Sequence, residues 1–516
     1  MNLAAAIFIL TSKRIGDSVK HRLAHIAFII TIVCTAHEKP LWAQLPAGPV
    51  TGQTGSPSAN SSTSTTSSIY SQPAAPQSQS SFTGSVPSKL VPGVLPISLE
   101  DAIARGLKQN LGLLLSSEDV GSARGARWQQ LSALLPNLTT TSYVDTSQIS
   151  LAEFGFNFKI PGSTIPSIVG PFTYYDSRAY ATQSVLDLKA INNTHAATES
   201  LKAAQHTSKD ARDLVVLAVG YNYLLAIADE ARIETAEAQV NTGQALYDQA
   251  SDQLKAGTSP AIDALRAQVE LQTRQQQLIQ SKNDLAIQKL TLARVIGLAP
   301  GQEYDLTDKS PYEPLEGLAV DEALKRAYAS RSDYQAALAT VRSAEYSRRA
   351  AQAGYYPSLA ASGDYGLAGT DSTLFTHGVF DLRATLTIPI FQGNKVHGDI
   401  LQADAQLQKS RDQLDNLRGQ IDADVRTALL NLESSAQLVA VATSNVGLAD
   451  ESLTQSRDRF AAGVTNTVEV VQAQEAVASA HENYISALYN YNYSKISLAR
   501  AMGFAEEGVK QYFKGK

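Results

Sequence analysis

The chain has 516 residues, 44% of them hydrophobic, with a net charge of −6 and a pI near 5.8. This length allows a large core, and the acidic balance without a long Lys/Arg cluster argues against binding to DNA or RNA. The one cysteine, Cys34, and the eight scattered histidines exclude a disulfide framework and give no metal-ligand pattern. We therefore expect neither a metal site nor any other cofactor.

The N-terminus is arranged like a secretory leader. Basic residues precede an apolar run from Leu23 to Ala36. We predict a signal peptide over residues 1–43, with cleavage before Gln44. The apolar run of about 14 residues is shorter than the roughly 20 that span a bilayer, which disfavours the alternative of a retained anchor.

Residues 44–96 are rich in Ser, Thr, Pro, Gln and Gly. Such a composition buries too little apolar surface to offset the entropy of ordering the chain. We predict a disordered tether here, and a folded part that begins near Ile97.

The folded part is predicted to contain one series of elements twice: a helix, two strands, a very long helix, a glycine turn and a return helix. The helices follow from apolar periodicity, acidic first turns and few internal Pro or Gly residues. The first copy spans 97–298 and the second 320–504, with a linker at 299–319 and a tail at 505–516. The expected helices are 99–131, 189–256 and 261–297 in the first copy, then 320–353, 394–462 and a return helix with seven-residue periodicity between Val470 and Leu498.

The duplication rests on segments that match at fixed shifts. Pro136-Asn-Leu recurs as Pro357-Ser-Leu 221 residues later, and Leu292 to Gly297 recurs as Leu498 to Gly503 206 residues later. One insertion between these points explains the change of shift. Chance similarity of Ala-rich helices is the alternative, but the matching Gly, Pro and Arg positions argue against it.

Four strands are expected, near 138–148, 174–188, 358–367 and 380–391. In the last of them the apolar side chains face one way, and the polar ones that face the other are Asp381, Arg383, Thr385 and Thr387. Apolar outside and polar inside is typical of a membrane barrel, so these four residues are expected to line its lumen. Four strands cannot close a barrel, because the smallest ones in membranes have about eight. Several chains must share one barrel, and a soluble hairpin sheet is the alternative.

These features together resemble the TolC-like outer-membrane efflux family over about residues 97–504. The segments that carry the resemblance are Ile388 to Gly393, Phe460 to Gln474 at the second turn, and Leu498 to Gly503. The resemblance implies a homotrimer with one shared barrel among outer-membrane lipids and a helical tunnel in the periplasm. It also implies docking onto a periplasmic adaptor (membrane fusion) protein and an inner-membrane transporter.

The two glycine turns are expected to dock the adaptor. Glycines at these turns are predicted to adopt backbone angles that a side chain disfavours, and small neighbours let another helical hairpin approach closely. The expected docking residues are Gly257, Thr258, Ser259, Gly463 and Val464. An ordinary tight turn without a partner is the alternative.

Residues just past these turns are expected to line the periplasmic entrance. Asp263 and Glu469 occupy equivalent positions in the two copies, and converging carboxylates in a narrow pore attract cations. By resemblance, related channels carry a third carboxylate at the position of Gln472 and a Tyr/Arg latch at those of Phe460 and Thr465. This chain departs from that pattern at all three positions, so we expect the entrance to close by apolar contact. The alternative is that both acids only stabilise helix N-termini, by about 0.3–1 kcal/mol each.

The predicted fold class is mainly α with a membrane β-barrel part. The predicted function is an outer-membrane channel subunit that conducts exported substrates, and the alternative is a non-conducting coiled-coil protein of the envelope. An enzyme is disfavoured, because the sequence has no Gly-rich phosphate loop and no nucleophile elbow. The identity of the exported substrate is expected to depend on the inner-membrane partner.

Overall fold

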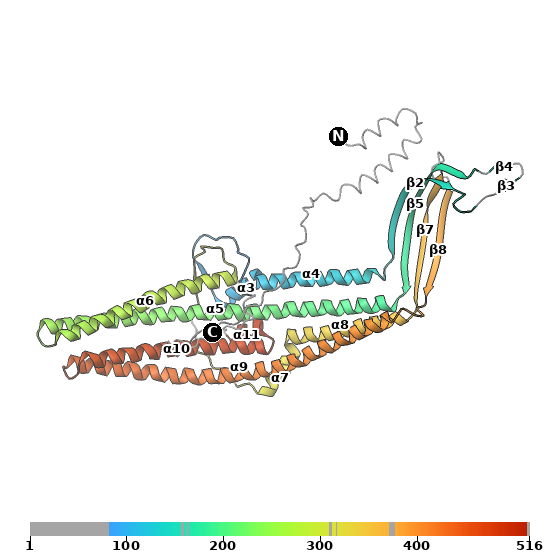
Figure 1. Cartoon of the computed structure of the whole chain (residues 1–516). Coiled ribbons are helices and arrows are strands. Elements are labelled where there is room, and N and C mark those ends of the chain that lie inside the picture. Colours follow the sequence, from blue (N-terminus) through green and yellow to red (C-terminus); the bar gives the residue numbers. More distant parts are fainter. Residues whose placement is uncertain are drawn as a thin grey trace, which may run out of the picture. The chain divides into compact units, whose positions relative to one another are not determined.

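The computed structural model describes residues 82–155, 159–160, 163–164, 166–308, 312–315, 317–370 and 377–512. The predicted signal peptide and most of the predicted tether lie outside these residues. The first half contains β1 (Leu95–Ile97), α3 (Leu99–Gln109), α4 (Leu111–Ser132), β2 (Asn137–Ser150), β3 (Lys159–Ile160), β4 (Ser163–Thr164), β5 (Ile168–Leu186), α5 (Leu188–Lys255), α6 (Ala261–Ile296) and β6 (Tyr304–Leu306) (Figure 1). The second half contains α7 (Val320–Ser330), α8 (Ser332–Gln352), the 3₁₀ turn η2 (Ala353–Tyr355), β7 (Ser358–Thr370), β8 (His377–Thr387), α9 (Lys395–Ala461), α10 (Thr467–Ala501) and α11 (Ala505–Tyr512).

The prediction of one continuous entry helix in each copy is wrong. Each is broken in two, at Asn110 and at Arg331, where the backbone turns extended (ψ 126° and 120°). The Asn110 side chain caps α4 by accepting from the amides of Gly112 and Leu113. Arg331 instead forms ion pairs with two carboxylates, at 2.6 and 3.0 Å. Polar side chains thus stabilise both breaks, which stand 221 positions apart.

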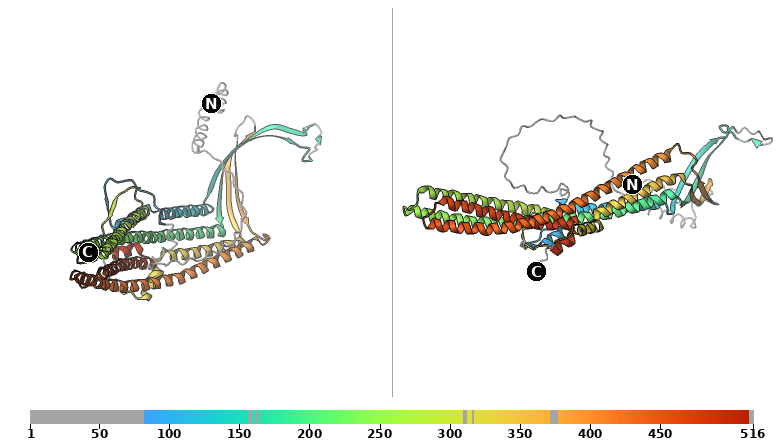
Figure 2. Two further views of the ribbon diagram at one scale, coloured as in Figure 1. Left: turned by 60° about the vertical axis from the view of Figure 1, so that its left-hand side comes forward. Right: turned by 90° about the horizontal axis from the view of Figure 1, so that it is seen from below.

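Four helices continue the four long strands in the same order. The sheet order is β2-β5-β7-β8, the helices joined to these strands are α4, α5, α8 and α9, and neighbours in this series pack on each other (Figure 1). Polar contacts connect them, such as Arg127 Nε donating to Thr198 Oγ1 at 3.2 Å and Arg342 Nε donating to Glu199 Oε2 at 2.9 Å. Figure 2 shows the same direct passage from strands to helices from two further directions.

The helices α5 and α9 are long, with 68 and 67 residues, which at about 1.5 Å per residue is roughly 100 Å each. Away from the sheet, α5 pairs with α6 and α9 with α10 as two hairpins. The hairpins meet near their turns in an apolar cluster that we call the tip cluster, formed by Leu246, Ala250, Ala267, Phe460 and Val470.

The largest core cluster surrounds the middle of α5 and includes side chains from α3, α6, α10 and α11. Tyr223 of α5 is fully buried there, and its hydroxyl donates to the Ile97 carbonyl oxygen at 3.0 Å and to Asp308 Oδ2 at 3.1 Å. Of the described helices, only α5 has a stretch apolar and long enough to cross a bilayer, and 61% of that stretch is buried within the chain. Packing in this core accounts for its apolar character.

The described end of the predicted tether is ordered, which differs from the expectation for residues 82–96. The Val86 amide donates to Gln109 O at 2.9 Å and the Ser88 amide to Gly297 O at 2.8 Å. Further along, β1 pairs with β6 in parallel. These contacts use backbone groups at the ends of α3 and α6, so they leave no signal in the side-chain composition that favoured disorder.

The four long strands form one antiparallel sheet whose bounds differ from those expected. β8 ends at Thr387 rather than at Phe391, because Pro389 has no amide hydrogen to continue the ladder. β5 begins at Ile168, where it pairs with Ser150. β5 therefore begins six residues before the expected start at 174.

Candidate functional sites on the sheet and at the hairpin turns

One face of the sheet is polar across all four strands. The register pairs Asp381 with Asp364, and Asp364 with Tyr180, so their side chains share a face. The expected lumen residues lie on this face together with residues from each other strand: Asp381, Arg383, Thr385 and Thr387 of β8; Ser362 and Asp364 of β7; Tyr174, Asp176, Arg178 and Tyr180 of β5; Thr139, Thr141, Tyr143 and Asp145 of β2.

A charge network that the sequence did not reveal lies at the centre of this polar face. Arg178 Nε donates to both carboxylate oxygens of Asp176, at 2.9 and 3.0 Å, and its Nη1 donates to Asp364 Oδ2 at 3.1 Å. The Tyr174 hydroxyl adds a hydrogen bond to Asp176 at 3.1 Å. Asp176 is only 3% exposed, so the guanidinium compensates a carboxylate that water does not reach. In the sequence, Tyr174, Asp176 and Arg178 stand at alternate positions, which predicts that their side chains share one face of a strand. The sequence does not indicate that Asp364 of β7 is their partner, because Asp364 is distant in sequence.

The opposite face of the sheet is apolar and unusually exposed. Leu382 is 81% exposed, Leu138 73% and Phe380 71%. The large apolar residues exposed on this face are Leu138, Val144, Tyr365, Leu367, Phe380, Leu382 and Leu386. Large apolar side chains exposed in this number are stable against lipid or another protein, but not against water.

Both sheet edges are open in the described chain. β2 and β8 each pair on one side only, with β5 and β7 respectively. A strand edge with unpaired amides and carbonyls is not tolerated in hydrocarbon, because no water is present to bond them. In a membrane, a sheet with these two open edges would need further strands beside β2 and β8.

The two hairpin turns have the same backbone hydrogen bonds. Gly257 and Gly463 have φ values of 72° and 69°, as expected, and a Cβ at either position would meet open space. The Gly257 amide donates to Leu254 O and the Thr258 amide to Gln253 O, each at 3.0 Å, and Gly463 and Val464 repeat both bonds. This is the Schellman arrangement that closes a helix. Val464 is 70% exposed at its turn.

The two expected entrance carboxylates occupy the first turns of α6 and α10. Ser259 Oγ donates to Asp263 Oδ2 at 3.0 Å, and Thr465 Oγ1 makes the equivalent hydrogen bond to Glu469. Their surroundings differ, because the Asp263 side chain is 9% exposed and that of Glu469 is 38% exposed. Arg459 Nε lies 3.2 Å from Glu469 Oε1. The geometry places both acids in the first turn of their helices, near the positive end of the helix dipole, and leaves Glu469 the more accessible of the two.

The remaining entrance residues differ in burial. Gln472 is exposed on α10. Phe460 is 4% exposed and packs in the tip cluster, between the hairpins of its own chain. Phe460 therefore contributes apolar contact between the two hairpins, rather than an exposed latch.

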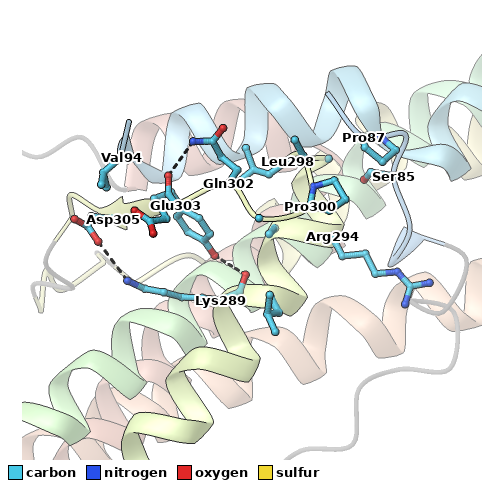
Figure 3. A pocket seen from close by; sticks show the side chains of 16 residues that line it. Ser85, Pro87, Val94, Lys289, Arg294, Leu298, Pro300, Gln302, Glu303 and Asp305 are labelled. Carbon is cyan, nitrogen blue, oxygen red and sulfur yellow. Dashed lines mark hydrogen bonds and ion pairs between the residues drawn. The ribbon is translucent and has the colours of Figure 1, made fainter. Parts of the chain in front are cut away.

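A pocket of about 540 Å³ lies where the 82–97 segment crosses the end of α6 (Figure 3). Lys289 Nζ lies 3.6 Å from Asp305 Oδ1 and 3.2 Å from Glu230 Oε1. The Tyr304 hydroxyl donates to the Lys289 carbonyl oxygen at 2.6 Å, and Gln302 Nε2 donates to the Glu303 carbonyl oxygen at 3.1 Å. The Lys289 contacts join α6 to α5 and to β6 along one side of the pocket, so we assign it a structural role.

An antiparallel sheet with one polar and one apolar face, continued by long helical hairpins, fits a channel protein of the outer membrane. The chain belongs to the outer membrane efflux protein family, whose model matches residues 107–298 and 323–504. Its location is accordingly the outer membrane.

Individual relatives are distant in sequence but similar in fold. The chain is 23% identical over 412 residues to the alkaline protease secretion protein AprF of Pseudomonas aeruginosa, covering 76% of this chain and 83% of that protein. It is 24% identical to outer membrane protein TolC of Escherichia coli over 142 residues, which span 28% of this chain and 29% of TolC. The crystal structure of VceC from Vibrio cholerae superimposes with a TM-score of 0.68 at 18% identity, covering 78% of this chain and 96% of that one. CusC gives a TM-score of 0.68 at 19% identity, with coverages of 85% and 99%.

Proposed function

We propose that the protein is the outer-membrane subunit of an export system, and that it conducts substrates from a periplasmic adaptor and an inner-membrane transporter to the exterior. The observation that carries this proposal is the sheet with one polar face, one apolar face and two open edges. Three copies would close their strands into one barrel, with β2 of each chain beside β8 of the next. The polar face, including Asp381, Arg383, Thr385 and Thr387, would then line the lumen.

Because each chain contributes four strands, the geometry requires only that the barrel has a multiple of four strands. The number of chains, three, is taken from the membership in the outer membrane efflux protein family. The helical hairpins would extend the barrel into the periplasm as a tunnel. The turns at Gly257 and Gly463 would dock the adaptor, because they are exposed and made of small residues. Glu469, the more accessible carboxylate, would contribute most to the ionic preference of the entrance.

Disulfide crosslinking tests the shared barrel, because the only native cysteine lies in the predicted signal peptide. A chain with one cysteine in β2 and one in β8, at positions such as Val144 and Leu382, should form covalent dimers and trimers on oxidation. The matched control places both cysteines inside one chain, at the paired positions Ala179 and Tyr365. That pair should crosslink without changing the oligomer. A scan of β2 and β8 positions that gives only monomers would overturn the proposal.

Ion conductance separates a channel from a non-conducting coiled-coil protein of the envelope. The purified trimer in a planar bilayer should give discrete conductance steps. A stable trimer without conductance, even after the hairpin turns are removed, would favour the structural alternative.

A further inference from the structure

An arginine near the end of α9 contacts the more accessible of the two entrance carboxylates. Arg459 Nε lies 3.2 Å from Glu469 Oε1, and this ion pair joins α9 to α10 across the second hairpin turn. The other oxygen of the carboxylate, Oε2, accepts a hydrogen bond from the Thr465 hydroxyl within the turn. Both oxygens of the Glu469 carboxylate are therefore bonded by groups of their own hairpin.

The first copy surrounds its own carboxylate in a similar way. Ser259, at the position equivalent to Thr465, donates from its hydroxyl to Asp263 Oδ2 at 3.0 Å. Arg266 Nη1 lies 3.7 Å from Asp263 Oδ1 and comes from the next turn of α6. Each acid thus has one hydroxyl and one arginine as neighbours.

The arginine stands at a different position in each copy. At the shift of 206 residues, Arg459 of α9 corresponds to Gln253 of α5. At the same shift, Arg266 of α6 corresponds to Gln472 of α10. Arginine and glutamine have therefore exchanged places between the copies, and the exchange keeps one arginine beside each acid. This pattern indicates that the site requires a compensated carboxylate.

The two turns and the helix ends beside them carry no net charge. Residues 251–266 contain two acidic and two basic side chains, and residues 457–472 contain the same numbers. Copies that converge at an entrance would therefore bring both signs of charge, rather than a ring of carboxylates alone. Two opposite charges in contact attract or repel a passing ion much less than a single charge does, because their Coulomb energies nearly cancel.

We propose that Arg459 offsets the charge of Glu469 at the periplasmic entrance, and that this ion pair limits the cation preference of the channel so that anionic substrates also pass. The inference rests on the proposed function, in which the hairpin turns line the entrance. The Arg459 side chain is 57% exposed and that of Glu469 38%, so both are accessible to water and to an ion that passes. Without the arginine, the carboxylates of three copies attract cations and repel anions, as charged rings do in other channels.

Reversal potentials of the full-length protein in planar bilayers test the proposal, measured in KCl gradients at low ionic strength, where charges are weakly screened. Arg459→Gln should raise the ratio of K⁺ to Cl⁻ permeability at least about threefold, because it leaves Glu469 uncompensated. Glu469→Gln should shift the ratio in the opposite direction. The double variant should return close to the original ratio, because it removes a pair without net charge. Exposed ion pairs contribute little to stability, so all three variants should remain trimeric.

Arg457→Gln is the matched control. Arg457 is exposed two residues earlier on α9, and among the described residues it forms no ion pair. Its replacement removes the same charge from the same turn of the helix and should change the permeability ratio much less. An unchanged ratio in Arg459→Gln, or an equal shift in Arg457→Gln, would refute the role of the ion pair while the channel still conducts. Absence of conductance in the original protein would instead overturn the proposed function, and this inference with it.

Discussion

Replacement of Asp213 by Asn should stabilise the protein at neutral and alkaline pH. Asp213 lies on α5 and is 8% exposed, and its carboxylate accepts a hydrogen bond from the backbone amide of Ala505 at the start of α11. Burial raises the pKa of Asp213 from 3.8 to about 6, and the nearby carboxylates of Asp210 and Glu506 add to this effect while Arg500 opposes it. The ionised form is therefore unfavourable in the folded protein.

The size and direction of the effect follow from this difference in pKa. A change of about two pKa units corresponds to about 3 kcal/mol. Because the folded-state pKa of Asp213 lies above the unfolded one, its contribution to stability is complete below pH 3.8 and is lost as the pH rises through about 6. Asn resembles the protonated carboxyl at every pH, so Asp213→Asn should restore up to about 3 kcal/mol at pH 8, about half of that at pH 5 and almost none near pH 3.

Thermal melting of the detergent-solubilised protein between pH 3 and pH 8, followed by circular dichroism, measures this difference. The apparent melting temperature of Asp213→Asn should exceed that of the original protein at pH 8, the excess should be about halved at pH 5, and the two should converge toward pH 3. Asp415→Asn, at an exposed carboxylate of α9, is the control and should shift the curve little at either pH. Parallel pH profiles, or a variant that melts lower at pH 8, would refute the assignment of the raised pKa to Asp213.

Four further outcomes are expected. Val464→Trp should abolish export but leave trimers intact in native gels, and export at the original rate would exclude adaptor docking at this turn. Asp263→Asn combined with Glu469→Gln should reduce the cation preference measured by reversal potentials. The Glu469→Gln single variant should retain most of this change. Unchanged selectivity would indicate that both acids only stabilise helix N-termini. Arg178→Met should lower the temperature at which trimers dissociate in SDS, because it leaves the buried carboxylate of Asp176 unpaired at a cost of about 3–5 kcal/mol. An unaltered dissociation temperature would contradict a stabilising role of this charge network. Gly463→Ala should destabilise by about 1–2 kcal/mol through its positive φ and Gly463→Asn by less, as measured by chemical denaturation, and equal effects would argue against the left-handed turn.

The long elements were predictable because their signals are local. The expected bounds of α5 and α9 differ from the observed ones by one residue at each end. Neither helix contains Pro, and a glycine in the left-handed conformation follows each within two residues of its end. The hairpin turns were predictable for the same reason.

Features that depend on tertiary contacts were not predictable. The break at Arg331 has no Pro or Gly to mark it, and it is stabilised by Asp424, which is 93 residues away in sequence. Asp364 and Arg178 meet only through strand pairing between the two halves. Residues 82–96 are ordered because their backbone groups form hydrogen bonds. Side-chain composition does not predict such bonds. The prediction for Phe460 identified its apolar character but could not show that its contacts lie within one chain.

The two helix breaks join elements at nearly the same backbone angles but respond to different solution conditions. Neutral amide hydrogen bonds stabilise the break at Asn110, and these are insensitive to ionic strength. The break at Arg331 depends on carboxylates, one of which, Asp424, is 41% exposed and open to screening by salt. A rise in ionic strength therefore weakens the contacts at the break at Arg331 but not those at the break at Asn110. The two halves of the chain have similar backbones, but salt destabilises them to different extents.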